Sequence, residues 1–333
     1  FKNRFRNEEK LEVFNFWCAF KMRRFLLFEK IFCDKMLLSN IVESGRFMEI
    51  ILGENAGFCY GVKRAVDGAE LEVKNADGKI YCLGEIVHNK EVVDELKEKG
   101  LEFIENISEA DATTIIRAHG VSKEVYKYAD ENGIDLKDYT CPNVLKIHKL
   151  AEEYSSNGYF IILFGSKKHP ENVGTISYCG EHYFVVENED ELFLAIDEIN
   201  RWKFNKVLVL SQTTFSLDNF YIFHEILRNE LNKDIELVVK NTICKATEIR
   251  QKETEELSKR VDCMIIIGGK NSSNTKKLYE IASKNCARAI CIETMKELDK
   301  RFLDGIEKVG VMAGASTPRN SIDEVCKILK QEI

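Results

Sequence analysis

The sequence lacks the features of a membrane, secreted or nucleic-acid-binding protein. Its longest apolar runs, at residues 159–164 and 263–267, are far shorter than the roughly 18 residues needed to cross a bilayer. An excess of positive charge is also lacking, because 55 acidic residues outnumber 48 Lys and Arg, the formal net charge is −7 and the isoelectric point is about 5.6. Such a chain offers no basic surface to nucleic acid or anionic lipid. We therefore expect a cytoplasmic protein with no membrane and no nucleic-acid partner.

The sequence contains many cysteines, but it lacks cysteines spaced closely enough to form a familiar metal-binding motif. None of the eleven cysteines forms a C-x-x-C motif, which is frequent in structural zinc sites, and no ferredoxin-like run of cysteines occurs. The cysteine count is odd, and a chain of 333 residues is large enough to build packed cores without disulfides. We expect free thiols in a reducing compartment.

Residues 1–47 differ in composition from the rest of the chain, being rich in Phe, Lys and Arg. Their apolar stretch at 25–28 is too short for a secretory signal, and Glu8, Glu9 and Glu12 are unusual in a transit peptide. We expect an N-terminal extension that lies outside the fold carrying the chemistry.

Three cysteines open three copies of one sequence block. Cys59, Cys141 and Cys244 each precede a helical pattern, and an apolar strand that ends in glycine then follows. The three glycines, which follow their cysteines by 25, 24 and 25 residues, are Gly84, Gly165 and Gly269. Such regular spacing indicates an internal repeat.

Each copy also places polar side chains in two loops. The first loop position comes four residues after the glycine, and the second follows another apolar strand. The first position holds His88, His169 and Ser273, and the second holds His119, Thr213 and Ser316. We therefore predict three copies of one α/β unit, each contributing one thiol and two polar loops to a shared centre.

Strands and helices alternate along the chain, which predicts parallel α/β architecture. We divide it into α/β domains at 48–140, 141–240 and 241–333, and expect the strand at 49–53 to begin the first. Two further strands are expected in each domain, at 79–83, 112–117, 159–164, 206–210, 263–267 and 309–313. Ligands of open parallel sheets bind beyond the carboxyl ends of the strands, where all the repeated polar residues fall.

The position of the three cysteines before helices indicates metal chemistry. A helix N-terminus stabilises a thiolate, and three thiolates from separate domains suit a [4Fe–4S] cluster with one iron that lacks a protein ligand. Zinc is the competing interpretation, although structural zinc usually takes four ligands. We interpret six other cysteines as small apolar residues within elements: Cys82, Cys179, Cys263, Cys286, Cys291 and Cys326.

The repeated loops carry hydrogen-bond donors and histidines, which suit a phosphate or diphosphate. The candidate residues are His88, His119, His169, Ser272, Ser273, Asn274 and Ser316. Helix capping is the plainer explanation for the serines and the asparagine. Glu171 could donate a proton if it were kept from water, with Thr213 relaying it, although an acid after Pro170 is also an ordinary helix start. We expect His148 to serve in packing.

Nine collinear motifs from Met48 onward resemble the 4-hydroxy-3-methylbut-2-enyl diphosphate reductase family. They are G-F-C-Y-G-V-K-R-A, E-I-V-H-N, R-A-H-G-V, T-C-P-N-V, K-H-P-E, S-Q-T-T, I-C-K-A-T, G-K-N-S-S-N-T and A-G-A-S-T-P. The family is similar in all the candidate residues but more often has other residues at Gly84, Arg117 and Lys168.

The resemblance implies a trefoil of three α/β domains around one [4Fe–4S] cluster held by Cys59, Cys141 and Cys244. It implies reductive dehydroxylation of the allylic diphosphate to isopentenyl and dimethylallyl diphosphate, the last step of the methylerythritol phosphate pathway. A donor such as ferredoxin or flavodoxin would supply the electrons. The implied catalytic residues are Glu171, Thr213 and His169. The implied substrate-binding residues are His88, His119, His169, Thr213, Ser272, Ser273, Asn274 and Ser316.

Two other functions stay open at this point. A quinolinate-synthase-like dehydratase also combines three α/β domains with three cluster cysteines, but it consumes no reducing equivalents. A metal-dependent sensor or a structural zinc protein would use the cysteines without catalysis.

Overall fold

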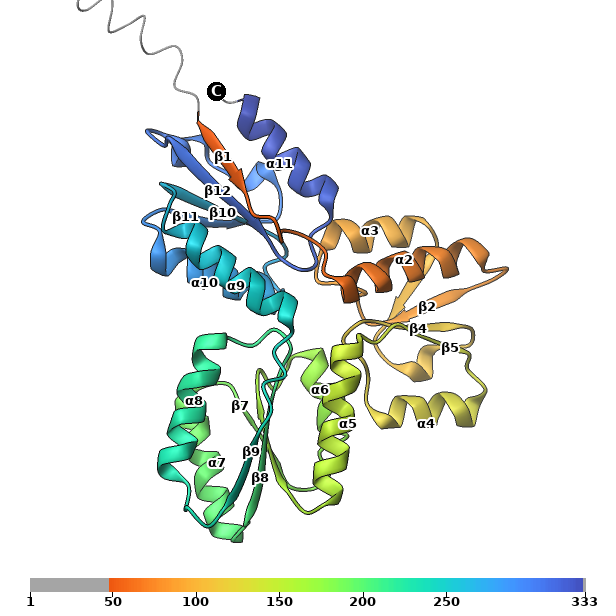
Figure 1. The fold of residues 1–333 in the computed structure, drawn as a ribbon. Helices are drawn as coiled ribbons and strands as arrows, with labels where there is room; N and C mark the ends of the chain where they lie inside the picture. The colour runs from red at the N-terminus through yellow and green to blue at the C-terminus, as the bar shows by residue number, and fades with distance from the viewer. Residues whose placement is uncertain (1–47, 332–333) are drawn as a thin grey trace, which may run out of the picture. The chain divides into compact units, whose positions relative to one another are not determined.

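The computed structural model describes residues 48–331 and contains three separate four-stranded sheets (Figure 1). All strand pairs in the three sheets are parallel. The expected α/β class with small parallel sheets is therefore confirmed. The predicted extension at 1–47 lies outside the described residues. No helix in the described part of the chain is long and apolar enough to cross a bilayer.

The first sheet has the strand order β3-β2-β4-β5. Its strands are β2 (Ile80–Leu83), β3 (Leu101–Ile104), β4 (Thr114–Ile116) and β5 (Leu136–Asp138). Its helices are α2 (Tyr60–Asn75), α3 (Lys90–Glu98) and α4 (Lys123–Asn132), with the short helix η1 (Ile107–Glu109) after β3. One face packs on α2 and α3 through Ala65, Ala69 and Leu96.

The second sheet repeats this order as β7-β6-β8-β9. Its strands are β6 (Phe160–Phe164), β7 (Tyr183–Val186), β8 (Lys206–Ser211) and β9 (Glu236–Val239). Its helices are α5 (Pro142–Ser156), α6 (Pro170–Ile176), α7 (Glu189–Trp202) and α8 (Leu217–Glu230). Alternate residues of β6 enter two different cores, one with α7 and α8 and one with α5. Both faces are covered, which explains why β6 is apolar at every position.

The third sheet has the order β11-β10-β12-β1. Its strands are β1 (Glu49–Leu52), β10 (Cys263–Ile267), β11 (Ala289–Ile292) and β12 (Lys308–Ala313). Its helices are α9 (Lys245–Ser258), α10 (Ser273–Asn285) and α11 (Arg319–Gln331), with η2 (Met295–Glu297) and η3 (Lys300–Leu303) between β11 and β12.

The assignment of the strand at 49–53 to the first unit is wrong. This strand, β1, pairs with β12 from Glu49 beside Lys308 to Leu52 beside Val311, so it belongs to the third sheet. Its apolar pattern predicts a strand but contains no information about its partner, because parallel pairing joins residues far apart in the chain. The domain boundaries at 140/141 and 240/241 stay predictions.

The position of β1 reveals how the three sheets are linked. The fourth strand of each sheet, β5, β9 or β1, leads directly into a cysteine. Each cysteine then begins the helix that packs on the next sheet: Cys59 begins α2, Cys141 begins α5 and Cys244 begins α9. The three cysteines therefore occupy equivalent crossings between sheets.

Phe164 tests the packing of the second sheet. It is fully buried, and its ring centroid lies 5.3 Å from that of Phe223 and 5.8 Å from those of Phe215 and Phe220. We expect Phe164→Ala to lower the free energy of unfolding by about 3–5 kcal/mol, because it leaves a cavity among these rings. Urea unfolding followed by circular dichroism measures the loss. The half-exposed Phe193 on α7 is the control, and equal losses for the two alanine variants would contradict this account of the core.

Candidate active site

All three repeat cysteines line one cavity. The space between the lining atoms is about 760 Å³, part of it open to solvent. The cavity is also lined by every other predicted site residue: His88, His119, His169, Glu171, Thr213, Ser272, Ser273, Asn274 and Ser316. The structure therefore brings the whole candidate set together, while the roles of its members stay predictions.

Close backbone approach brings the cysteine ends of the helices together. A Cβ atom on Gly61, in the first turn of α2, would lie only 2.8 Å from the Cys141 Sγ. The Asn143 side chain, in the first turn of α5, donates a hydrogen bond to the Cys244 Sγ at 3.2 Å. The Val62 N–H donates to the Cys59 Sγ at 3.5 Å. The thiols therefore sit at helix N-termini, where the backbone favours the thiolate form.

The three sulfur atoms fit a multinuclear group better than a single zinc ion. Sulfur atoms on one zinc lie at most about 4.6 Å apart, because each Zn–S bond is about 2.3 Å. Among residues 48–331, only His88, His119 and His169 offer three ligand atoms that all lie within 4.8 Å of one another. The cysteines are thus spaced too widely to share one ion. Three partly exposed thiols at helix starts are a donor set that fits an iron–sulfur cluster with one iron lacking a protein ligand.

Burial raises the pKa of the Cys141 thiol, and the neighbouring Cys59 and Cys244 raise it further. The N–H groups of Asn143 and Val144 lower it. The Cys141 thiol therefore feels the charge of the other two cysteines. Deprotonating all of them together would need a compensating cation, and a metal group supplies one.

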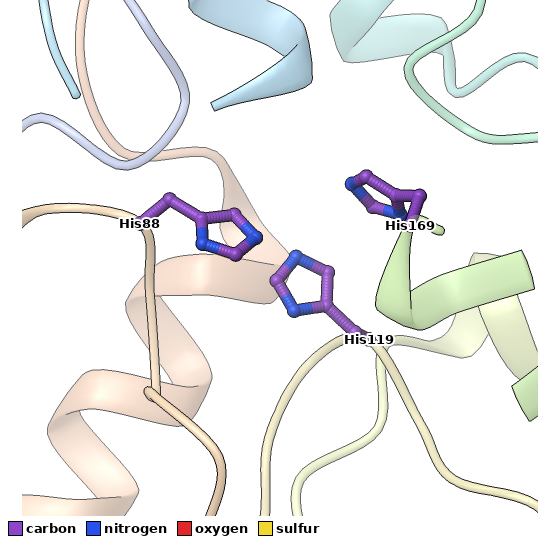
Figure 2. A group of neighbouring side chains, drawn as sticks. All are labelled: His88, His119 and His169. Atoms are coloured by element: carbon purple, nitrogen blue, oxygen red, sulfur yellow. The ribbon is translucent and has the colours of Figure 1, made fainter. Parts of the chain in front are cut away.

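Three histidines also line the cavity, and their rings point toward one another (Figure 2). The His88 and His119 ring centroids are 5.1 Å apart, those of His119 and His169 are 5.3 Å apart, and those of His88 and His169 are 6.1 Å apart. His88 lies in the loop after β2, His119 in the loop after β4, and His169 caps α6. They therefore come from two sheets.

Burial lowers the pKa of all three histidines, to about 4 for His169. The positive charge of Arg117 lowers each of them further. At neutral pH the three imidazoles are thus uncharged, and they act as hydrogen-bond donors rather than as charges. The His169 Nδ1 accepts the Glu171 N–H at 3.2 Å, which leaves its Nε2 to carry the proton.

The histidine spacing alone would also admit a divalent ion. The surrounding positive charges favour an anion instead. The charge of Arg117 lowers the pKa of all three histidines, and the charge of Lys276 also lowers that of His88. Arg117 additionally donates a hydrogen bond to the Glu85 carbonyl at 2.9 Å, which joins the loops that carry His119 and His88.

The third sheet contributes serines and one asparagine. Ser272 caps α10 by accepting the Thr275 N–H, as the plainer explanation expected. Asn274 is different, because it is 3% exposed and neither its amide nitrogen nor its oxygen has a protein partner. An unpaired buried amide costs about 1–3 kcal/mol, so this side chain is placed to meet a ligand. The Ser316 hydroxyl donates to the His88 carbonyl at 3.4 Å.

The loop of the third sheet lies directly against the histidine loop of the first. A Cβ atom on Gly269 would stand 2.0 Å from the His88 carbonyl oxygen. Only glycine permits this approach. The glycine that directly follows β10, as Gly84 follows β2 and Gly165 follows β6, is Gly268, so the predicted repeat position of Gly269 is wrong by one residue.

Glu171 and Thr213 form a buried, hydrogen-bonded pair that lines the same cavity. The Thr213 hydroxyl donates to the Glu171 Oε2 at 2.5 Å, and the Thr213 N–H donates to Oε1 at 2.6 Å. Burial raises the pKa of Glu171 to about 7, although both Thr213 donors oppose that rise. A carboxyl group with this pKa can release and regain a proton near neutral pH.

His148 confirms its predicted packing role. It is buried, and its ring stacks on that of Tyr178 with centroids 4.2 Å apart.

Sequence reasoning missed Arg250, Asn143 and Thr214, which also line the cavity. These residues do not match across the repeats. The only signal in the sequence was that each lies close to a predicted site residue: Arg250 six residues after Cys244, Asn143 two after Cys141 and Thr214 one after Thr213.

Comparisons with known proteins agree with the fold. The model of the family described as LytB protein matches residues 50–330. A 4-hydroxy-3-methylbut-2-enyl diphosphate reductase of Caldanaerobacter subterraneus subsp. tengcongensis is 41% identical over 289 residues, covering 85% of this chain and 97% of that protein.

Two solved structures are also similar. One, described as (E)-4-hydroxy-3-methyl-but-2-enyl diphosphate reductase, the terminal enzyme of the non-mevalonate pathway, has a TM-score of 0.63 at 39% identity. The alignment covers 86% of this chain and 100% of that one. The other, an E-1-hydroxy-2-methyl-but-2-enyl-4-diphosphate reductase from Plasmodium falciparum, has a TM-score of 0.78 at 30% identity. It covers 85% of this chain and 88% of that one.

The raised pKa of Glu171 predicts a pH-dependent stability. Between the ordinary pKa of 4.5 and about 7, the folded chain holds a proton that the unfolded chain has lost. The free energy of unfolding therefore falls as pH rises through this window, by roughly 3 kcal/mol from this one group. Urea titrations at a series of pH values should show that Glu171→Gln lacks this decrease.

Thr213→Val serves as the companion variant. It removes a hydroxyl that lowers the pKa of Glu171, so its decrease in stability should extend to higher pH than in the wild type. Parallel pH profiles for the wild type and Glu171→Gln would contradict the raised pKa.

Proposed function

The chain belongs to the LytB protein family, and we propose that it reduces (E)-4-hydroxy-3-methylbut-2-enyl diphosphate to isopentenyl and dimethylallyl diphosphate. Membership confirms the family predicted from the sequence. The proposal includes a [4Fe–4S] cluster held by Cys59, Cys141 and Cys244, and places the reaction last in the methylerythritol phosphate pathway.

One observation carries the proposal: a single cavity joins three metal-binding thiols, an anion pocket and a proton donor. Cys59, Cys141 and Cys244 lie in its lining together with the histidines and with Glu171. A dehydratase or a zinc protein would need only part of this set. The proposed reaction uses all three, because it needs electrons, a held diphosphate and protons.

The bound cluster would supply electrons and a Lewis acid for cleavage of the carbon–oxygen bond. The chain's own contribution at this end is to fix the three sulfurs at the starts of α2, α5 and α9. The partial positive charge of these helix starts lowers the cost of three neighbouring thiolates.

The three histidines, His88, His119 and His169, would hold the diphosphate by donating N–H hydrogen bonds. His169 carries its proton on Nε2, and the unpaired Asn274 amide has donor capacity left. Ser316 and Ser273 add hydroxyl groups. Because the imidazoles are neutral, Arg117 supplies the fixed positive charge that the anion experiences. Binding here would leave the uncharged end of the substrate directed toward the cysteines.

Glu171 would supply protons through Thr213. The reaction takes up two electrons and two protons: the carbon–oxygen bond breaks, one proton leaves with the oxygen as water, and the other adds to carbon. Protonated Glu171 can donate its proton to the Thr213 Oγ1 while the Thr213 hydroxyl passes its own hydrogen to the substrate in the cavity, which regenerates the hydroxyl and leaves Glu171 as a carboxylate. The pKa of about 7 keeps this carboxyl group partly protonated at neutral pH. A ferredoxin or flavodoxin donor and a cytoplasmic location also belong to the proposal.

Turnover under anaerobic conditions tests the proposal. Protein purified without oxygen should be coloured, and with a strong reductant it should convert the hydroxymethylbutenyl diphosphate while consuming two reducing equivalents per product. Product analysis with a reductant assay measures both quantities. Turnover without reductant would favour the dehydratase, and a colourless protein would favour a zinc site.

Matched cysteine variants complete this test. Cys141→Ser should lose iron and turnover because it removes one of the three proposed ligands. Cys291→Ser, in strand β11 and outside the cavity lining, should retain both. A full iron content in Cys141→Ser would remove this residue from the ligand set.

Glu171→Gln tests the proton route separately. It keeps the size of the side chain but has no proton to release, so we expect kcat to fall at least about 100-fold, with little change in cluster content or KM. Steady-state kinetics and iron analysis provide these values. The exposed Glu181→Gln is the control, and near-normal turnover in Glu171→Gln would exclude this carboxyl group from the mechanism.

A further inference from the structure

Arg250 is a buried cation in the cavity lining that has no place in the reaction as described so far. It lies on α9, six residues after Cys244, and is 5% exposed. Its guanidinium donates to the Gly57 carbonyl at 2.7 Å and to the Ala246 carbonyl at 3.1 Å. Its buried Nε has no partner. Among the described residues, no carboxylate lies within ion-pair distance of it.

Two cysteines and one carboxylate are the charged groups that act on Arg250. Burial lowers its pKa, while the charges of Cys59, Cys244 and Glu253 raise it. An arginine stays protonated even in such a site, because its ordinary pKa is above 12. A permanent positive charge, itself buried, therefore shares the cavity lining with two of the three proposed ligands and interacts with their charges.

The same helix also fixes the loop that carries Cys59. Arg250 binds the Gly57 carbonyl, and the Glu253 carboxylate accepts the N–H groups of Glu54 and Asn55 at 2.5 and 3.1 Å. The Asn55 side chain adds a third hydrogen bond to Glu253 at 3.0 Å. Since α9 begins at Cys244, these contacts set the position of Cys59 relative to Cys244.

We propose that Arg250 is a positioning residue that holds the Cys59 loop and, by its charge, eases reduction of the group that the cysteines hold. The inference rests on the proposed function, because it requires a cluster. Adding an electron to a thiolate-bound cluster increases negative charge, and a nearby buried cation stabilises the reduced form more than the oxidised form. Removing the charge should therefore shift the midpoint potential to a more negative value.

Three variants separate charge from position. Arg250→Gln removes the charge, Arg250→Lys keeps it with fewer donors, and Glu253→Gln weakens the same loop contacts while removing a negative charge. At a fixed reductant potential, we expect the ratio of reduced to oxidised cluster in Arg250→Gln to fall about tenfold, which is about 59 mV for a one-electron couple. Arg250→Lys should stay near the wild type, and Glu253→Gln should stay level or shift the opposite way.

Spectroelectrochemical titration of the anaerobically purified holoenzyme provides the potentials. An unchanged potential in Arg250→Gln would overturn the inference. Equal negative shifts in all three variants would also overturn it, because loop position alone would then explain them. If Arg250→Gln holds no iron, a full cluster in Arg250→Lys supports the charge role, and loss of iron from both overturns it. The two proposals can fail separately. If the wild type turns over normally but the midpoint potential of Arg250→Gln is unchanged, this inference is refuted and the proposed function is left intact.

Discussion

Every part of the candidate site depends on how the chain passes from one parallel sheet to the next. The fourth strand of each sheet runs into a cysteine, and that cysteine starts the helix covering the following sheet. Parallel strands carry their functional loops at their carboxyl ends, so each crossing delivers a thiol to the same region as the polar loops. The pairing of β1 with β12 gives the third sheet its fourth strand, which makes the Cys59 crossing equivalent to the other two.

Burial then sets the electrostatics of the cavity. It lowers the pKa of the three histidines and raises that of Glu171 to about 7, so both kinds of group favour their neutral forms. Two fixed positive charges interact with the groups that would bind ligands. The charge of Arg117 lowers the pKa of the histidines, and the charges of Cys59 and Cys244 raise the pKa of Arg250. One cavity lining thus combines three histidines under the influence of Arg117, three cysteines that share the lining with Arg250, and a carboxyl group with a raised pKa.

Repetition in the sequence singled out residues that the structure brings to one cavity, while their roles stay predictions. Two strands of each sheet are apolar and buried, as β6 and β10 are, so their patterns were clear. The edge strands β3, β5, β7, β9 and β11 were missed, since they have three or four residues and several are half exposed. Arg250 was missed as well, because an arginine on a helix is ordinarily solvent-exposed and only the packing of α9 against the Cys59 loop buries it.

The sequence by itself determined the α/β class, the equivalence of the three cysteines and the residues of the polar loops, because spacing and hydrophobic period are local properties. Tertiary structure alone decided which sheet receives β1, which histidines face one another, and that Asn274 is left without a protein partner. These outcomes depend on contacts between residues far apart in the chain. Charge balance was likewise decided only on folding, because a pKa shifts through burial and neighbours that a linear pattern does not contain.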